Sequence, residues 1–598
     1  MAEPQPKDET MIGYPFLKDN IEALKDYCPP VYMWLSSQEY DPERLNERLF
    51  KNQWDILDWR IDNEEGRGMF DAMPPNLLYK EWAPKDKPHT SATVIVGCNV
   101  GYGLNHVLAN SPDSHKIVVV EPRPEMLLAC LGQTDYRPFF ANKKLHICPP
   151  NEDYFMQIVK NMDLQFIYGN IHLRGDTASR QLGPEYAKWT RLCQERLENF
   201  SLELTTLRFR QDVMVGNELK NFQRALHGGS MKPLEGRAAG VGAVILGAGP
   251  SLADSAKTLA ENPGYALYTT ALQTMPALQP HGLKPHLCMA LDYDGSMRRI
   301  YDRLDPEFAK DVPLIYSTKV DPWVVEQYPG PKMPMWTVGG LATYLMREHE
   351  LVLDAGGNVS LTLARLLRWL GVGHITLVGQ DFAWINERSH SDGHHATRKQ
   401  FEFDPKRHQK LKNMDGEEII STPQYLTAKR DLEEDLKKAP FPIYNVYGGG
   451  APINGSRRVT LEEAIMQGAF SSAPGSLERF MADFEASRDI SNPIHIRPAS
   501  HEWASSLRRV EKRLTKLFRN CRNNQKEIHQ ALTQVDMFVK QNPVYLPYLY
   551  NETLNLAGLT RAKATYEPRD LSEFKRISKS ILQKVREVDR HVCPKQAA

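Results

Sequence analysis

The stretch that most constrains the fold is residues 243–252, Ala-Val-Ile-Leu-Gly-Ala-Gly-Pro-Ser-Leu. Four apolar residues run directly into Gly247, Gly249, Pro250 and Ser251, and a helical pattern follows. This order predicts a buried parallel strand, a tight turn and the start of a helix. Because backbone N–H groups at a helix start favour anions, the turn suits a phosphate; a purely structural turn is the alternative. Leu252 occupies the place of the third glycine of a dinucleotide fingerprint, so NAD is not predicted.

Strand and helix patterns alternate throughout residues 236–470. The predicted strands are 243–246, 266–270, 287–291, 312–316, 333–338 and 374–378, and the clearest helix is 359–370. Such alternation predicts an α/β fold with a doubly wound, Rossmann-like central domain, whose binding crevice lies at the carboxyl ends of the strands. Polar clusters are expected to converge there, at 247–251, 269–273, 292–294, 356–358 and 379–381.

A second strand-to-glycine turn covers residues 92–103, and Glu121 ends the next predicted strand. A carboxylate in that place can accept hydrogen bonds from a ribose. The segment resembles the methyltransferase type of Rossmann unit, which holds S-adenosylmethionine. A second Rossmann-like, N-terminal domain is therefore expected, either with such a ligand or keeping only the shape.

Length and composition limit the remaining organisation. A chain of 598 residues is too long to fold around a single hydrophobic core. We expect an N-terminal cap (1–90), a Rossmann-like domain (91–190), a helical connector (191–235), the central domain (236–470) and an α-helical C-terminal domain (475–598). Zero formal net charge argues against nucleic acid as a partner. Without a long apolar run, a signal peptide or CxxC cysteine pairs, the sequence predicts a cytoplasmic protein with no membrane span.

Two acidic motifs follow predicted buried strands. Asp292 and Asp294 are one residue apart, a spacing that can hold Mg²⁺ or Mn²⁺ beside a nucleotide phosphate. Sugar or ribose hydrogen bonding and loop capping are the alternatives. Gln380 and Asp381 follow strand 374–378, where an acid can orient a substrate hydroxyl or cap a turn.

A histidine cluster, Ser-His-Ser-Asp-Gly-His-His, covers residues 389–395. Histidine titrates near neutral pH, which suits a general base, and His390 is the candidate. A surface loop and a metal site are the alternatives, although the spacing does not match a zinc pattern.

The C-terminal region predicts long helices. Apolar residues from Leu507 to Phe538 follow a heptad spacing interrupted at Asn524, and a second helix with a capping-box-like start opens at Asp570, with Glu573 three residues on. Two antiparallel helices are expected. Their heptads permit a homo-oligomer, and the basic residues between 508 and 522 are expected to face solvent.

The order of motifs in the central domain resembles the motility-associated factor (Maf) family, which shares its core with the MptE-like 6-hydroxymethylpterin diphosphokinases. The resemblance rests on Gly247-Ala-Gly-Pro-Ser-Leu, on residues 284–292, and on the segments 356–360, 378–383 and 449–453. It implies a cytoplasmic glycosyltransferase that moves a nonulosonic acid from a CMP donor to Ser or Thr of flagellin or another acceptor protein.

The resemblance also implies roles for individual residues. Gly247, Gly249 and Ser251 would hold the CMP phosphate, Asp292 and Asn358 would contact cytidine or ribose, and Pro250 and Gln380 would lie at the donor. Asp381 and His390 would be the catalytic residues, Asp381 by positioning donor or acceptor and His390 as the base. Two further functions stay open: diphosphate transfer from ATP to a pterin alcohol, and nucleotide binding without catalysis.

Overall fold

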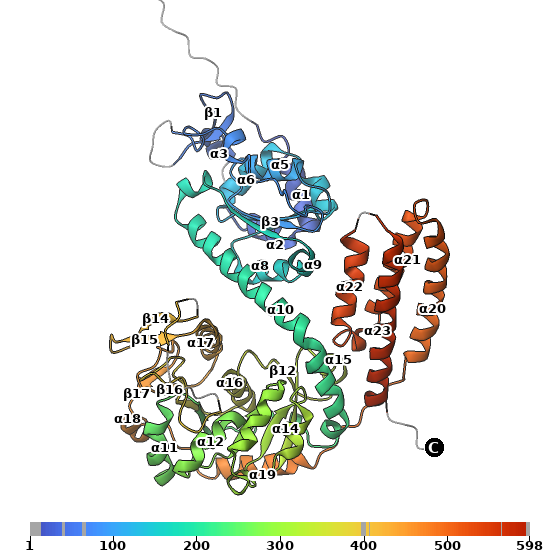
Figure 1. Ribbon diagram of the computed structural model, residues 1–598. Coiled ribbons are helices and arrows are strands. Elements are labelled where there is room, and N and C mark those ends of the chain that lie inside the picture. The colour runs from blue at the N-terminus through green and yellow to red at the C-terminus, as the bar shows by residue number, and fades with distance from the viewer. Residues whose placement is uncertain are drawn as a thin grey trace, which may run out of the picture. The chain divides into compact units, whose positions relative to one another are not determined.

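In the computed structural model, the apolar run before Gly247 forms β7 (Gly242–Leu246), an inner strand of a large parallel sheet (Figure 1). The structure describes residues 13–38, 42–61, 67–395, 402–405, 407–563 and 565–593. Within these ranges the chain forms two compact units. Unit 1 comprises Met1–Phe209, Lys512–Asp536 and Glu552–Ile577, and unit 2 comprises Arg210–Glu511, Met537–Asn551 and Ser578–Ala598.

The sheet of unit 2 has nine strands in its described part, in the order β12-β11-β10-β9-β8-β7-β13-β16-β17, and every neighbouring pair is parallel. Besides β7, these are β8 (Leu267–Ala271), β9 (Leu287–Ala290), β10 (Leu314–Ser317), β11 (Lys332–Thr337), β12 (Val352–Leu353), β13 (His374–Val378), β16 (Ile443–Val446) and β17 (Arg457–Val459). The strand order reverses between β7 and β13. This confirms the predicted α/β fold with a mainly parallel sheet.

Both faces of this sheet are covered by helices. Ala243 and Ile245 pack on the side of α16 (Val359–Leu370), whereas Val244 and Leu246 pack on the side of α11 (Leu252–Glu261). Burial on both faces is why β7 is a continuous apolar run. The other helices are α12 (Met275–Leu278), α13 (Pro306–Ala309), α14 (Pro322–Gln327), α15 (Ala342–Leu345), α17 (Pro423–Leu436), α18 (Leu461–Met466) and α19 (Ser476–Arg488). A hairpin of β14 (Gln409–Lys412) and β15 (Glu418–Ser421) stands apart from the sheet.

Unit 1 contains a smaller parallel sheet in the order β5-β4-β3-β6. Its strands are β3 (Ala92–Val96), β4 (Lys116–Val120), β5 (Leu145–Cys148) and β6 (Ile171–Gly175). Around it lie α1 (Leu17–Tyr27), α2 (Pro29–Ser36), α5 (Tyr102–Ala109), α6 (Pro124–Gln133), α7 (Arg137–Ala141), α8 (Glu152–Val159) and α9 (Asp163–Tyr168). The segment before β3 holds α3 (Pro42–Arg48), β1 (Leu49–Lys51), β2 (Leu57–Trp59) and α4 (Pro75–Leu78).

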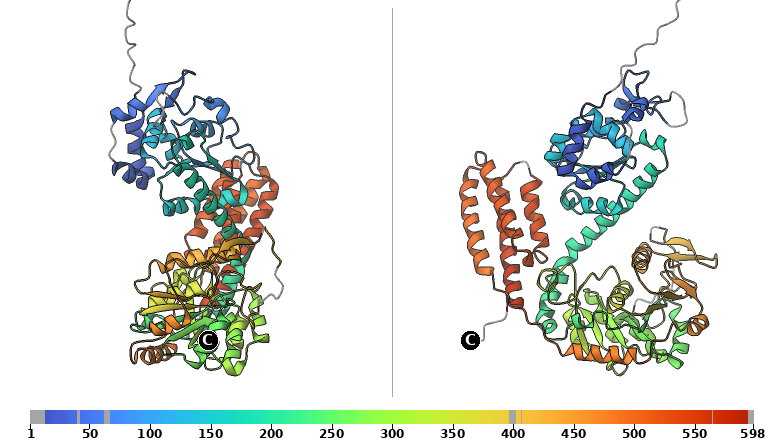
Figure 2. Two further views of the ribbon diagram at one scale, coloured as in Figure 1. Left: turned by 90° about the vertical axis from the view of Figure 1, so that its left-hand side faces the viewer. Right: turned by 180° about the vertical axis from the view of Figure 1, so that it is seen from behind.

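A single long helix, α10 (Glu185–Leu226), forms the predicted helical connector (Figure 2). It begins six residues before the predicted connector and contributes its first part to unit 1 and its last part to unit 2. Because the two units combine several of the five predicted segments, the predicted domain boundaries stay predictions.

The C-terminal region is helical, as predicted, but the number of helices was wrong. The described residues form α20 (Ser500–Leu517), α21 (Gln525–Lys540), α22 (Tyr550–Arg561) and α23 (Pro568–Val592). Asn524 separates the first two, because its side chain donates to the Leu517 carbonyl at 2.9 Å. The last helix begins two residues before Asp570, and Glu573 pairs with Arg576 instead of closing a capping box.

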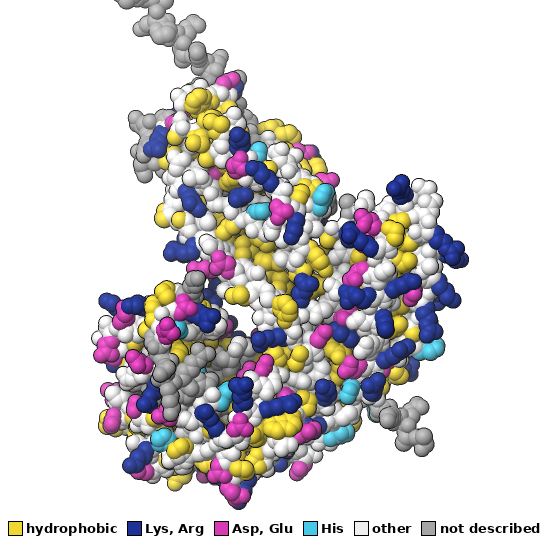
Figure 3. All heavy atoms as spheres, in the orientation of Figure 1, with side chains coloured by type: hydrophobic (Ala, Val, Ile, Leu, Met, Phe, Trp, Pro, Cys, Tyr) yellow, Lys and Arg dark blue, Asp and Glu magenta, His cyan; other side chains and the backbone are white. Residues whose placement is uncertain are grey.

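The basic residues of this region face solvent, as predicted. All seven between positions 508 and 522 are exposed, and Figure 3 shows Lys and Arg side chains standing out over α20. The predicted homo-oligomer stays a prediction. Within the described ranges, none of the helices combines the length and apolar character that a membrane crossing requires. All eight cysteines are free thiols and six of them are buried.

Candidate functional site

The candidate site lies where the strand order of the large sheet reverses. β7 and β13 are neighbours, and later strands extend from each of them in opposite directions. In open α/β sheets the crevice outside the carboxyl ends of such a pair binds ligands. The loops 247–251 and 379–381 follow these two strands, so the structure brings together two of the predicted polar clusters.

The two loops are bonded to each other through their backbones. Gly247 donates its N–H to the Val378 carbonyl at 2.8 Å, and Gly249 donates to the Gly379 carbonyl at 2.9 Å. These are the amides that the sequence assigned to a phosphate. In the structure they hold the neighbouring loop instead, so the turn joins two strand ends.

The absence of side chains at the two glycines permits this close approach. A Cβ added to Gly247 would lie 2.2 Å from Nε2 of Gln380, and one added to Gly249 would lie 2.4 Å from Oδ2 of Asp381. No real Cβ tolerates such distances, so any other residue would push the loops apart. Pro250, which follows, has no N–H and so adds no unsatisfied amide to the turn.

Asp381 and Ser251 form a buried pair within this joint. The Ser251 hydroxyl donates to Oδ1 of Asp381 at 2.6 Å, and the Ser251 N–H donates to Oδ2 at 2.8 Å. Burial raises the pKa of Asp381 to about 6, the two Ser251 hydrogen bonds lower it, and Asp254 raises it. A third loop closes over the pair, because a Cβ on Gly448 would lie 2.1 Å from that of Ser251. Both carboxylate oxygens of Asp381 therefore hold the loops in place.

Three side-chain amides at this edge of the sheet keep unused hydrogen-bonding atoms. Nε2 of Gln380, Nδ2 of Asn358 and Oε1 of Gln273 are buried without a partner among the described residues. Gln380 follows β13, Gln273 follows β8, and Asn358 precedes α16, which runs back from the carboxyl edge. Buried polar atoms are nearly always satisfied in folded proteins, by protein, water or ligand. These three groups are the best candidates for contacts to a bound ligand.

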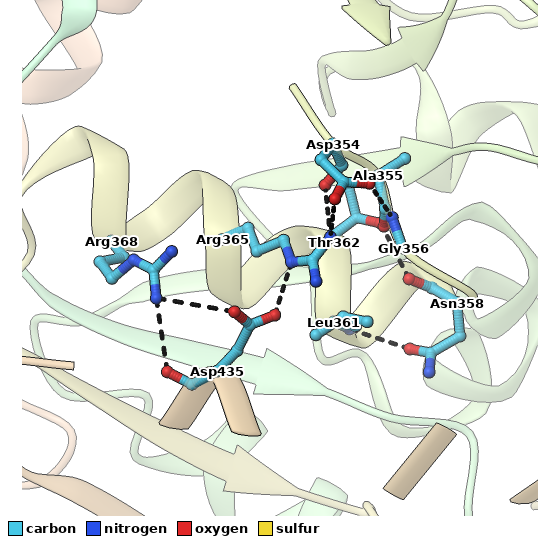
Figure 4. Close-up of polar contacts among 9 residues, drawn as sticks. All are labelled: Asp354, Ala355, Gly356, Asn358, Leu361, Thr362, Arg365, Arg368 and Asp435. Atoms are coloured by element: carbon cyan, nitrogen blue, oxygen red, sulfur yellow. Dashed lines mark hydrogen bonds and ion pairs between the residues drawn. The ribbon is translucent and has the colours of Figure 1, made fainter. Parts of the chain in front are cut away.

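Asn358 is held rigidly at the start of α16 (Figure 4). Its Oδ1 accepts from the Leu361 N–H at 2.9 Å, which makes Asn358 the N-cap of the helix. Arg365, one helical turn after Leu361, contacts Oδ2 of Asp354 at 3.2 Å and Oδ2 of Asp435 at 2.5 Å. These ion pairs fix the loop before the helix to α16 and α17. The free amide nitrogen of Asn358 is therefore positioned before any ligand arrives.

The predicted acidic pair follows β9. Asp292 is exposed to solvent, and its Oδ2 accepts from Nε2 of Gln273 at 2.8 Å. Surrounding protein atoms raise the pKa of Asp292, the Gln273 bond lowers it, and the nearby Asp294 raises it. Asp294 caps a 3-10 turn by accepting from the Ser296 N–H at 2.8 Å, a contact that lowers its pKa. Each carboxylate keeps one oxygen outside these contacts.

A helix from outside the predicted site fixes this acidic loop. Arg210 on α10 donates to the Tyr293 hydroxyl at 2.9 Å, and Asn217 donates to the backbone carbonyls of Tyr293 and Lys319 at 3.1 Å each. Asn221 donates to the carbonyls on either side of Lys319, at 2.9 and 2.8 Å. Sequence reasoning missed these residues, and the only signal was a pair of asparagines four residues apart in a helix, where asparagine is unfavourable.

A divalent ion at this loop would have few protein ligands. Among the residues that the structure describes, no three His, Cys, Asp or Glu side chains form a group that could hold a metal. The predicted Mg²⁺ site at Asp292 and Asp294 stays a prediction, and an ion there would need water or substrate oxygens to complete its coordination shell.

The histidine loop contains stacked imidazoles. His390 lies on His394 with ring centroids 4.2 Å apart and an angle of 2° between the planes. Nδ1 of His390 lies 3.0 Å from the Ser389 hydroxyl, and Nε2 lies 3.4 Å from the Tyr425 hydroxyl. Burial, followed by the neighbouring histidines, lowers the pKa of His394 to about 2. His394 therefore stays neutral and places no charge beside His390.

This loop is attached to the other parts of the site. Ser391 donates its N–H to the Ala248 carbonyl in the glycine turn at 2.9 Å. Burial lowers the pKa of His395, whereas the nearby Asp292 raises it. Nδ1 of His395 is another buried atom without a hydrogen-bond partner among the described residues. The histidine loop thus lies between the glycine turn and the acidic loop.

Beside the glycine turn of unit 1, donors of the protein itself bond the Glu121 carboxylate. Glu121 is fully buried, and its oxygens accept from the Cys98 N–H at 2.8 Å, the Arg123 N–H at 3.0 Å and the Tyr186 hydroxyl at 2.7 Å. Burial raises the pKa of Glu121 to about 7. Protein donors therefore take the oxygens that a ribose would need. Both expectations for this turn, a bound ligand or a Rossmann-like shape without one, stay predictions.

Comparisons with known proteins agree with the family resemblance that the order of motifs predicts. Residues 216–387 match a family model described as 6-hydroxymethylpterin diphosphokinase MptE-like. The structure is also similar to that of a Maf glycosyltransferase from Magnetospirillum magneticum AMB-1, with a TM-score of 0.63 and 15% sequence identity over 96% of each chain. No curated protein sequence matches this chain significantly. The predicted resemblance is confirmed: the chain carries an MptE-like domain and has a Maf-like fold.

Proposed function

We propose that this protein is a glycosyltransferase that moves a nonulosonic acid from a CMP donor to a Ser or Thr hydroxyl of flagellin or another acceptor protein. The observation that carries the proposal is the set of groups at one edge of the sheet: unpartnered buried amides, an accessible carboxylate and a histidine loop. The fold shared with a Maf glycosyltransferase supports it. Because nucleotide-activated sugars are cytoplasmic metabolites, we place the reaction in the cytoplasm.

The donor would be bound by the groups that the protein leaves unused. The amide nitrogens of Gln380 and Asn358 donate to phosphate or cytosine oxygens, and Gln273 and Asp292 accept from ribose hydroxyls. In this assignment Gly247, Gly249, Pro250, Ser251 and Asp381 shape the floor of the crevice. Asp381 is then a positioning residue, because Ser251 engages both of its oxygens.

The transfer itself needs one base and a stabilised leaving group. The acceptor hydroxyl oxygen attacks the anomeric carbon, and its proton passes to an imidazole nitrogen of His390. The bond from the anomeric carbon to the phosphate oxygen breaks, and its electron pair leaves with CMP. The neutral His394 stacked on His390 does not repel the proton gained there. A Mg²⁺ at Asp292 and Asp294 would neutralise the charge that develops on CMP.

The test is transfer from CMP-pseudaminic and CMP-legionaminic acid to flagellin encoded by the same genome, measured by the intact mass of the acceptor. His390→Asn is expected to lower kcat about 100-fold or more, because a positioned general base contributes that much. The matched control is His227→Asn at an exposed position, which should keep full activity. Full activity of His390→Asn would remove His390 from the mechanism. Absence of both transfer and CMP binding would reject the proposed function.

The family-model match favours one second candidate, transfer of diphosphate from ATP to a pterin alcohol. That reaction would release AMP and require Mg²⁺ at Asp292 and Asp294. Thermal shift distinguishes the candidates, since a ligand at 100 times its Kd stabilises the folded protein by about 2.7 kcal/mol. Stabilisation by CMP supports the glycosyltransferase, and a Mg²⁺-dependent response to ATP alone supports the diphosphokinase. Binding without any turnover would indicate a non-catalytic nucleotide-binding protein.

A further inference from the structure

The open edge of the smaller sheet, in unit 1, offers a row of unpaired backbone groups. β6 is the outermost strand beside β3. The Ala92 N–H donates to the Asn170 carbonyl at 2.9 Å, and the Asp176 N–H donates to the Val96 carbonyl at 2.8 Å. In a parallel pair of strands, every second residue of a strand bonds the neighbouring strand. The residues between them point their N–H and C=O groups to the other side. The N–H and C=O groups of Ile171, Leu173 and Gly175 therefore point away from β3, with no partner among the described residues.

A groove runs along this edge. Its cavity volume is about 630 Å³. The three outward-facing residues of β6 form one side, and α10 forms the opposite side with Thr190, Gln194, Leu197, Glu198 and Ser201. Phe166 adds an apolar surface. The groove therefore combines free backbone donors and acceptors with a wall of mixed polar and apolar side chains.

The other edge of the same sheet is protected. On β5, Leu145 and Ile147 are buried at 1% and 2% exposure, and the thiol of the buried Cys28 lies against the Ile147 backbone. Every residue of β6 is half-buried. β6 contains no proline or lysine, and its one charged residue, Arg174, belongs to the set whose backbone bonds β3 and not to the outward-facing set. Because proteins normally block such edges, the open groove at β6 indicates a binding surface.

We propose that an extended segment of the acceptor protein binds in this groove as a fifth strand beside β6. The inference rests on the proposed function, which supplies a protein acceptor. An extended peptide is the one ligand that offers alternating N–H and C=O groups at the spacing of a strand. Side chains on one face of that segment meet Phe166 and Leu197.

Charge at one end of the groove specifies the segment further. The Arg180 guanidinium covers Gly175, since a Cβ built there would lie 2.3 Å from Nη2. Arg180 is exposed and has no acidic partner in the part of the chain that the structure describes. The bound segment therefore carries an Asp or Glu where it passes Arg180.

The experiment fills the groove from α10 and leaves the sheet unchanged. Gln194→Trp places an indole in the groove, and Glu195→Trp, at the next and also exposed position of α10, is the matched control. Gln194→Trp is expected to raise KM for flagellin about tenfold, a loss of about 1.4 kcal/mol in binding, with CMP-donor hydrolysis unchanged. Arg180→Glu should raise the same KM without filling the groove. Unchanged KM in both variants would overturn the proposal.

Hydrogen–deuterium exchange across residues 169–176 measures directly whether the outward-facing amides of β6 are bonded, independently of transfer activity. In the free protein the amides of Leu173 and Gly175 should exchange quickly, whereas His172 and Arg174, bonded to β3, should not. Added flagellin should slow the first pair in the wild type and in Glu195→Trp only. Protection that depends on protein concentration without flagellin would identify a second copy as the occupant and overturn the proposal. Normal protection without sugar transfer would refute the proposed function alone.

Discussion

The joint between the two loops of the large sheet can be tested with Ser251→Ala. The substitution removes the hydroxyl that donates to Oδ1 of Asp381 at 2.6 Å and keeps the backbone bond to Oδ2. A hydrogen bond to a buried charged group contributes about 1.5–3 kcal/mol, and one to a neutral group about 0.5–1.5 kcal/mol. The cost should therefore depend on whether Asp381 is ionised.

The pKa of Asp381 fixes the pH range of this effect. Burial raises that pKa from 3.8 to about 6, so Asp381 binds its proton more tightly in the folded protein than in the unfolded one. The stability that this difference supplies is present below pH 3.8 and is lost as the pH rises through about 6. Ser251→Ala removes a bond that lowers the pKa, so it should cost about 2 kcal/mol at pH 8 and about 1 kcal/mol at pH 5.

The assay is native-state hydrogen exchange of β7 and α11 at both pH values, because a chain of two units does not unfold in one step. The matched control is Ser255→Ala, four residues further on. Ser255 is equally buried and has no hydrogen bond among the described side chains, so its loss should cost no more than about 0.5 kcal/mol. Equal costs for the two variants, or a cost that does not change with pH, would refute the role assigned to the pair.

Two further predictions concern positions where the chain packs tightly against itself. Gly448→Ala should abolish transfer and loosen the site, because its Cβ would lie 2.1 Å from that of Ser251. Gly373→Ala is the control, since a Cβ there meets only ordinary contacts. Activity and hydrogen exchange of the two variants check the prediction. Glu121→Gln should flatten the pH dependence of unit 1 stability. The raised pKa of Glu121 makes that unit lose about 3 kcal/mol between pH 4.5 and about 7, and hydrogen exchange of β3 at pH 5 and pH 7.5 measures the loss. An unchanged slope in the Gln variant would assign the pH dependence to another group.

The sequence predicted what short-range patterns encode. The apolar run before Gly247 became β7, the predicted strand 374–378 coincides with β13, and the helix 359–370 has the bounds of α16. Periodicity and flanking glycines suffice there, since each element is apolar on the sides it buries. The short edge strands β12 and β17 escaped prediction because two or three residues carry no periodicity. The helix α22 was missed because it is buried nearly all round and shows no amphipathic stripe.

The roles of the site residues were harder to predict. Gly247 and Gly249 were expected to bind phosphate through their amides, and in the structure these amides bond a loop about 130 residues further along the chain. Asp381 was expected to face the substrate, and Ser251 engages it instead. A glycine-rich turn has the same composition whether its partner is an anion or another loop. Only the three-dimensional contacts distinguish the two.

The joint at the reversal of strand order restricts how this domain can change. Its three loops, at 247–251, 379–381 and 448–451, fit together with no space for one additional methyl group at Gly247, Gly249 or Gly448. A hybrid protein with the first loop from one homologue and the other two from a second homologue would combine loops that do not fit one another. Substitutions in these loops should therefore be inherited together, and segment exchange between homologues should succeed only when all three are exchanged as a set.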